Sequence, residues 1–220
     1  MALQFASTIE HTLLRPEATE NQIQRLCDEA KQFSFFGVCV PPRFVSHASQ
    51  WLAESSIRVV SVVGFPLGYQ TTRDKVREAQ ELKNSGADEL DMVIQIGALK
   101  EPLYDFVCEE IRAIVKSIEP LPLKVIIETC LLTDDEKKKA SELVVKAGAH
   151  FVKTSTGFST AGATPADIQL IRKVVGPEFG IKASGGIKTL DQALTLIQAG
   201  ANRIGSSSSV SMFQEWSQKK

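Results

Sequence analysis

Residues 145–154 read VKAGAHFVKT, and this stretch joins a helix to a strand. Gly148 falls where the end of a helix requires a left-handed backbone, which glycine adopts at little cost. Phe151 and Val152 then favour an extended conformation. The strand ends on Lys153, an amine whose burial is unfavourable unless it is paired or neutral. The stretch therefore predicts a helix–turn–strand unit whose final lysine needs a chemical reason.

The same Gly-Ala turn recurs in NSGADELDMV (84–93) and IQAGANRIGS (197–206). Between these turns, short apolar runs alternate with longer segments whose apolar residues lie three and four positions apart, as in amphipathic helices. Helical patterns cover residues 21–33, 71–86, 105–118, 134–148 and 189–200. The strand candidates are residues 8–14, 36–42, 57–66, 88–96, 123–129, 150–156, 180–186 and 203–209.

The alternation of these segments predicts the fold. Strands that are near-continuous apolar runs are typical of a parallel sheet covered by helices. Eight strand–helix units in 220 residues fit the small end of the (β/α)8 barrel range. No linker or break in composition divides the chain, so residues 1–220 are predicted to form a single-domain α/β barrel. A doubly wound sheet is the alternative, but it predicts a G-x-G-x-x-G motif after the first strand, which is missing.

Composition limits the partners. The net charge is −1 and both signs are spread along the chain, which argues against nucleic acid or an anionic membrane as the main partner. Four cysteines form no C-x-x-C pair, as is typical of reduced thiols. The N-terminal sequence lacks the features of a signal peptide, and no apolar run reaches the length of a membrane span. We therefore predict a cytoplasmic protein.

In a (β/α)8 barrel the active site lies at the carboxyl ends of the strands. Two lysines, Lys153 and Lys182, occupy equivalent positions on adjacent predicted strands, and Asp91 lies late in another. We expect these three side chains to converge at the barrel mouth. The polar residues late in the predicted strands are Thr12, Cys39, Asp91, Glu128, Lys153, Lys182 and the serines after Gly205.

Paired lysines point to amine chemistry. A lysine attacks a carbonyl only as the free amine, and its reference pKa is ~10.4. A neighbouring ammonium and partial desolvation lower such a pKa to about 7–8. The amine then forms a Schiff base with an aldehyde or ketone. This hypothesis makes one of the two lysines, Lys153 or Lys182, the nucleophile and the other the cation beside it. Asp91 is the candidate acid/base, and this role is compatible with its also being a structural partner of Lys182.

An anion site is predicted beside the lysines. Glycines and serines follow the last two predicted strands, in SGGIKT (184–189) and IGSSSSV (204–210). Exposed N–H groups at a helix N-terminus bind phosphate, and glycine allows close approach. These loops are the usual phosphate position in this fold. Metal chemistry is not expected, because His11, His47 and His150 show no ligand spacing.

Five segments together resemble the deoxyribose-phosphate aldolases, class I aldolases built on a (β/α)8 barrel. They are IEHTLL (9–14), GVCVPPRF (37–44), ELDMVI (89–94), FVKTSTGF (151–158) and IKASGGIKT (181–189). The resemblance extends from about residue 8 to residue 210. Two residues depart from the family pattern. Arginine is frequent where this chain has Lys188, and some members have a lysine where it has Phe158.

The resemblance implies reversible cleavage of 2-deoxy-D-ribose 5-phosphate to acetaldehyde and D-glyceraldehyde 3-phosphate, without metal or organic cofactor, by a protein that could be a homodimer. It implies that Lys153 forms the Schiff base, that Lys182 lowers its pKa and that Asp91 relays protons. The implied substrate-binding residues are Gly157, Gly185, Gly186, Ser207, Ser208, Thr12 and Cys39. Two alternatives remain open from the residues: a phosphosugar isomerase, or a catalytically silent phosphosugar-binding barrel.

Overall fold

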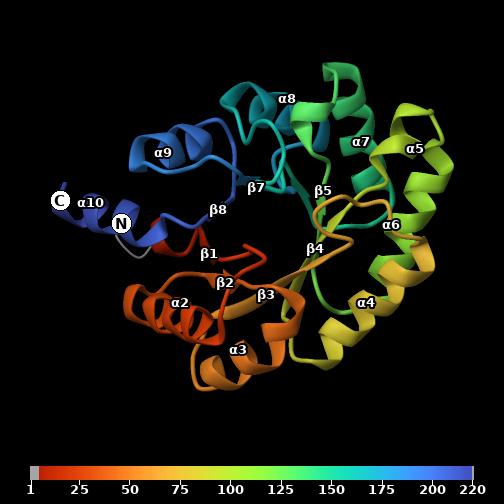
Figure 1. The fold of residues 1–220 in the computed structure, drawn as a ribbon. Helices are drawn as coiled ribbons and strands as arrows, with labels where there is room; N and C mark the ends of the chain where they lie inside the picture. The colour runs from red at the N-terminus through yellow and green to blue at the C-terminus, as the bar shows by residue number, and fades with distance from the viewer. Residues whose placement is uncertain (1–4, 220) are drawn as a thin grey trace.

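The computed structural model describes residues 5–219, whose eight strands close into one parallel barrel (Figure 1). The strands are β1 (Ile9–Thr12), β2 (Gly37–Cys39), β3 (Arg58–Val63), β4 (Glu89–Val93), β5 (Leu123–Ile126), β6 (Phe151–Lys153), β7 (Gly180–Ser184) and β8 (Arg203–Ser206). Each strand pairs with the next along the chain, and β8 pairs with β1. The predicted (β/α)8 barrel is therefore confirmed.

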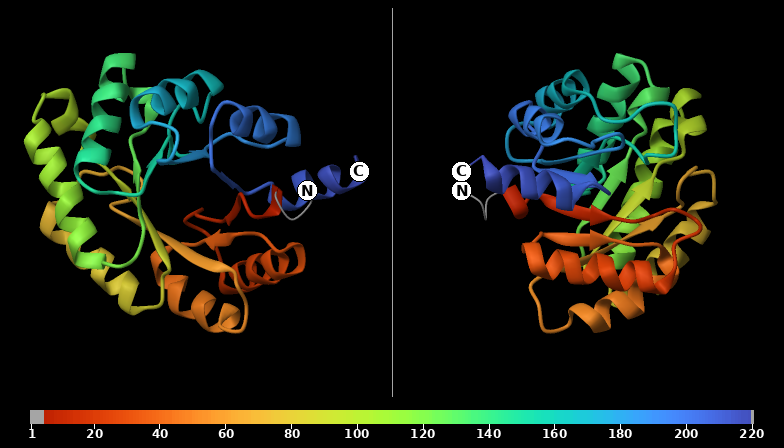
Figure 2. Two further views of the ribbon diagram at one scale, coloured as in Figure 1. Left: turned by 180° about the vertical axis from the view of Figure 1, so that it is seen from behind. Right: turned by 60° about the vertical axis from the view of Figure 1, so that its left-hand side comes forward.

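Helices surround the barrel and connect its strands, as the views in Figure 2 show. Helix α10, at the end of the chain, contacts both α2 and β1. None of the helices within residues 5–219 is both long and apolar enough to cross a bilayer. The helices are α2 (Glu20–Phe33), α3 (Val45–Leu52), α4 (Thr72–Asn84), α5 (Ile96–Lys100), α6 (Tyr104–Ile118), α7 (Asp134–Lys146), α8 (Pro165–Val175), α9 (Leu190–Gln198) and α10 (Ser209–Gln218), with short 3-10 helices η1 (Pro42–Phe44) and η2 (Thr129–Leu131).

The Gly-Ala turns join helix to strand as the sequence predicts. Gly86, Gly148 and Gly200 have positive φ angles of 98°, 83° and 117°, which glycine adopts without the steric cost of a Cβ atom. The residue after the alanine then bonds to the preceding strand: the N–H of Asp88 donates to Val59 O at 2.7 Å. The N–H groups of His150 and Asn202 make the same kind of bond in the other two turns, to Leu123 O at 2.9 Å and to Ile181 O at 2.8 Å. Each turn thus ends a helix and sets the register of the next strand.

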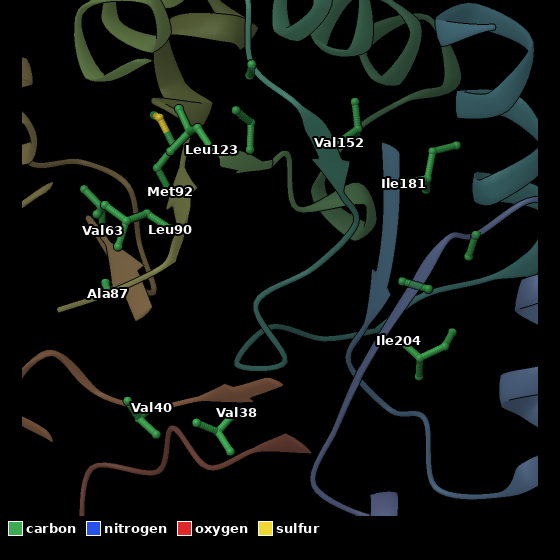
Figure 3. Packing of buried hydrophobic residues seen from close by; sticks show 14 of the residues in the cluster. Val38, Val40, Val63, Ala87, Leu90, Met92, Leu123, Val152, Ile181 and Ile204 are labelled. Carbon is green, nitrogen blue, oxygen red and sulfur yellow. The ribbon is translucent and has the colours of Figure 1, made fainter. Parts of the chain in front are cut away.

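The two faces of the barrel strands differ in character. Outward-facing residues such as Leu90, Met92 and Val152 pack beneath the helices in the main apolar core (Figure 3). Successive side chains of a strand point to opposite faces. The residues that alternate with these outward-facing ones therefore turn inward, and they include the buried Asp91 and Lys182. The sequence presents the strands as apolar runs, but the inward face carries a cluster of charges.

Outside the cluster on the inward face, a buried ion pair connects two helices with the barrel. Lys75 of α4 donates to Glu110 Oε2 of α6 at 2.9 Å and to Val93 O at the end of β4 at 2.8 Å. Both charged side chains have no exposed surface. Breaking a buried pair by removing one partner is strongly destabilising, because the other charge stays buried without compensation.

Replacing Lys75 with methionine is therefore expected to lower the free energy of unfolding by about 3 kcal/mol. Urea unfolding measures this change. Lys173→Met alters an exposed lysine of α8 and should change stability by less than about 0.5 kcal/mol. The Lys75→Met/Glu110→Leu double variant should recover much of the loss, since it leaves no unpaired charge. Equal stabilities of Lys75→Met and Lys173→Met would contradict this role.

Candidate active site

The structure brings the two predicted lysines and Asp91 together inside the barrel. Lys153 ends β6 and lies in register with Lys182 of β7. The Nζ atoms of Lys153 and Lys182 donate to the same carboxylate oxygen, Oδ2 of Asp91, at 2.8 and 2.6 Å. All three side chains are buried. Lys153 at the end of β6, together with Asp91 and Lys182 in the middle of β4 and β7, thus forms one amine–carboxylate–amine cluster.

Four further residues of this buried charge cluster were not identified from the sequence, namely Glu10, Glu89, Lys124 and Arg203. Lys124 of β5 donates to Asp91 Oδ1 at 2.9 Å, and Glu10 of β1 forms an ion pair with Lys182. Both side chains are fully buried. Lys124 lies inside the apolar run LKVII, and alternation of inward and outward residues around Leu123 and Val125 is the sequence signal that could have identified it.

The charges in the cluster determine the protonation of its members. Burial opposes ionisation of Asp91, but Lys124, Lys153 and Lys182 overcome this effect and hold the pKa of Asp91 well below its usual value. Burial likewise opposes a charge on Lys182, but Asp91 and Glu10 outweigh it and raise the pKa of Lys182 above its usual value. In the resting site Lys182 is therefore a cation, and Asp91 is an anion.

A pocket of about 910 Å³ opens above the cluster. Lys153 and Lys182 lie at its floor, and Thr12 forms part of its wall. Asp91 lies beneath the lysines and does not line the pocket. Lys153 is thus the amine that combines access to the pocket with a single carboxylate partner, whereas Lys182 pairs with two.

Cys39 does not reach the pocket lining, although it lies at the carboxyl end of β2. The side chain is fully buried, and burial raises the pKa of the Cys39 thiol to about 11. Candidate ligand atoms of Cys39, Glu10 and Asp91 lie within 4.8 Å of one another. This set fits a metal ion poorly, because the thiol holds its proton and lysines already neutralise both carboxylates.

The predicted anion-binding loops form one side of the pocket. Gly157, Gly185, Gly186, Ser207 and Ser208 all line it. The three glycines have positive φ angles of 85°, 84° and 73°. Helix α10 begins directly after Ser208, so its positive end borders the pocket. Basic side chains that the sequence analysis did not assign to this site also line it, namely Arg15, Arg25 and Lys188.

Close packing explains two of the glycines around the site. A Cβ atom on Gly205 of β8 would lie 3.0 Å from Lys182 Cε. A Cβ atom on Gly162 would lie 2.0 Å from the carbonyl oxygen of Gly185. At Gly162 two backbone segments therefore approach more closely than a larger residue permits, and at Gly205 the missing side chain leaves room for Lys182.

Comparison with known proteins gives a consistent result. Residues 5–215 match the model of the DeoC/LacD family aldolases. The chain is 55% identical over 213 residues to a deoxyribose-phosphate aldolase of Lysinibacillus sphaericus, with 96% of both chains covered. It is also 55% identical over 214 residues to one of Thermococcus gammatolerans, covering 96% of this chain and 95% of the relative.

Solved structures agree over the whole barrel. A crystal structure of a putative deoxyribose-phosphate aldolase from Coccidioides immitis superposes with a TM-score of 0.96 at 40% identity, covering 99% of this chain and 87% of the other. A tetrameric deoxyribose phosphate aldolase from Aeropyrum pernix superposes with a TM-score of 0.93 at 33% identity, covering 100% and 94%. With its barrel and nearly its whole length in common with these proteins, the chain belongs to the DeoC/LacD aldolase family.

Proposed function

We propose that the protein cleaves 2-deoxy-D-ribose 5-phosphate reversibly to acetaldehyde and D-glyceraldehyde 3-phosphate through a Schiff base on Lys153. The observation that carries this proposal is the position of Lys153, which lines the pocket and whose amine donates to Asp91 Oδ2 at 2.8 Å. An amine held against a carboxylate at the floor of a pocket has both the access and the proton partner that Schiff-base chemistry requires.

The steps follow from the chemistry of an iminium. The neutral amine adds to C1 of the open-chain sugar, and loss of water forms a protonated C=N bond. The C3 hydroxyl gives up its proton, the C2–C3 bond breaks, and its electron pair moves to the iminium to form an enamine. C3 leaves as the aldehyde of glyceraldehyde 3-phosphate. Protonation of C2 and hydrolysis then release acetaldehyde and restore Lys153. Asp91 is the proposed relay for these protons.

The buried charges around Asp91 do not cancel one another. The inner cluster contains the cations Lys124, Lys153, Lys182 and Arg203 and the carboxylates Glu10, Glu89 and Asp91, which are linked by ion pairs. The positive charges exceed the negative charges by one. An iminium on Lys153 would place its positive charge close to Asp91, which stabilises it.

Borohydride trapping tests the proposal. Treatment with acetaldehyde and borohydride should give one reduced adduct, and peptide mass spectrometry should locate it at Lys153. A phosphosugar isomerase or a silent binding barrel would form no covalent adduct under the same treatment. An adduct confined to Lys182 or Lys124 would assign the nucleophile to a different residue.

The phosphate of the sugar is proposed to bind at the loops after β7 and β8. The support is the arrangement of Gly185, Gly186, Ser207 and Ser208 around one side of the pocket, with the positive end of α10 beside them. The chain carries a net charge of −1, so this local site has to supply most of the attraction for a dianion.

Ser207→Asp is expected to lower kcat/KM for deoxyribose 5-phosphate by about 100-fold, because facing like charges cost several kcal/mol and each 1.4 kcal/mol is tenfold. Cleavage of unphosphorylated deoxyribose should fall far less, since Lys153 and Asp91 are untouched. The measurement is kcat/KM for both sugars. Ser207→Asn is the control for shape, because asparagine has nearly the same size as aspartate but carries no charge. Equal losses on the two sugars would place the phosphate elsewhere.

Several properties stay predictions. The role of Thr12 in substrate binding belongs here, and so does the absence of a cofactor. The cytoplasmic location, the homodimer and the treatment of residues 1–220 as one domain are further predictions of the sequence.

A further inference from the structure

Glu128 has an unusual backbone conformation beside the pocket. It lies two residues after the end of β5 and directly before η2, with φ 54° and ψ 68°. Such left-handed angles cost a residue other than glycine on the order of 1–3 kcal/mol, and they persist only where surrounding contacts impose them. The side chain is buried with 2% exposure. The strain therefore indicates that contacts of the buried Glu128 side chain fix this residue in place.

The carboxylate of Glu128 binds a single residue strongly. Thr156 Oγ1 donates to Glu128 Oε2 at 2.5 Å, and the N–H of Thr156 lies 3.2 and 3.3 Å from the two carboxylate oxygens. Thr156 Oγ1 in turn accepts from the N–H of Phe158 at 3.0 Å. No ion pair joins Glu128 to a basic side chain of residues 5–219. A buried carboxylate without a cation is costly. Its short contacts all go to Thr156, and the Cys130 thiol lies farther away, 4.0 Å from Oε1.

The loop that contains Thr156 follows the proposed nucleophile directly. Thr156, Gly157 and Phe158 line the pocket, whereas Glu128 does not. The first part of the loop is fixed from the opposite side, where Ser184 Oγ of β7 donates to Ser155 O at 2.5 Å. The second part, at residues 156–158, is fixed to the end of β5 through Glu128. The loop is therefore held between two strands that flank β6.

We propose that Glu128 is a positioning residue that acts through Thr156 to hold the 156–158 wall of the pocket in place for the sugar phosphate. This inference rests on the proposed function, because it assigns the wall to the same substrate. Glu128 touches neither Lys153 nor the pocket, so its effect should fall on binding of the sugar phosphate and spare formation of the Schiff base.

Glu128→Gln tests the proposal with little change in shape. Both Thr156 groups that face Glu128 are donors, and an amide offers one acceptor oxygen and a competing donor. One hydrogen bond is therefore lost, which should loosen the wall and raise KM for deoxyribose 5-phosphate about tenfold, with a smaller change in kcat. Acetaldehyde and borohydride should still give the reduced adduct on Lys153.

A double-mutant cycle tests whether the effect of Glu128 on KM depends on the hydroxyl of Thr156. Thr156→Val removes the hydroxyl and should raise KM, while Thr156→Ser keeps the hydroxyl and should raise it less. If Glu128 acts through Thr156, the Glu128→Gln/Thr156→Val variant should raise KM by less than the product of the single effects. Should Glu128→Gln fail to fold in a urea titration, the Thr156→Val and Thr156→Ser pair tests the same hydroxyl link.

Three results would overturn the inference. They are an unchanged KM in Glu128→Gln, full multiplicativity in the cycle, and loss of the Lys153 adduct in a folded Glu128→Gln protein. The last result would mean that Glu128 serves the amine itself. Failure of the proposed function looks different, since wild-type protein would then give no adduct with acetaldehyde or deoxyribose 5-phosphate.

Discussion

Lys153→Ala should abolish aldol cleavage, lowering kcat by about 10⁴-fold or more, because removal of the nucleophile eliminates the covalent route. The barrel should still fold, since Asp91 keeps Lys124 and Lys182 as hydrogen-bonded partners. Steady-state cleavage of deoxyribose 5-phosphate measures the loss, and urea unfolding checks the fold. Lys146→Ala removes an exposed lysine of α7 and should leave kcat unchanged.

Lys153→Arg separates nucleophile from charge. Arginine keeps the positive charge at all accessible pH values but cannot act as a neutral amine. We expect this variant to be as inactive as Lys153→Ala. If Lys153 only bound an anion, as in the isomerase alternative, arginine would retain much of the activity. Substantial turnover in either variant would therefore remove Lys153 from the role of nucleophile.

Lys182→Leu is expected to lower activity at neutral pH by about 100-fold and to move the activity–pH profile to higher pH. The raised pKa of Lys182 keeps it charged throughout the working range, so it repels a proton on Lys153 and shares the Asp91 oxygen with it. Without Lys182, the ammonium form of Lys153 gains Asp91 Oδ2 for itself and loses its neighbouring cation. More alkaline conditions are then needed to free the amine.

The pH series distinguishes this role from direct proton transfer. Lys182→Arg keeps a fixed cation, and its profile should stay close to that of the wild type even if turnover falls. Glu10 retains Lys124 and Arg203 as ion-pair partners in both variants, which supports folding. A uniform loss in Lys182→Leu with no alkaline shift would show that Lys182 handles a proton itself.

The sequence by itself determined the order and type of the elements and part of the site. Glycine at each Gly-Ala turn has a local reason, since only residues of low steric cost adopt its positive φ. Such local signals predicted the eight strands, and the barrel rule on strand ends then predicted that Lys153, Lys182 and Asp91 meet. Their contacts with one another are in the structure, while their catalytic roles stay predictions.

Only the tertiary structure decided which side chains turn inward and at what depth. Strands β1 and β5 are four residues long, too short for their inward phase to be clear from sequence. Lys124 therefore remained hidden in an apolar run, and Glu10 was not connected with Lys182, which lies 172 residues away.

Cys39 and Glu128 show that a position near a strand end does not determine what a side chain contacts. Cys39 was expected in the pocket from its place at a strand end, but barrel closure buries it beneath the lining. Glu128 gains its partner Thr156 only because β5 and β6 are adjacent. A strand end fixes the edge of the barrel at which a residue lies. Depth, facing and partner depend on the register between strands, which comes from contacts far apart in the chain.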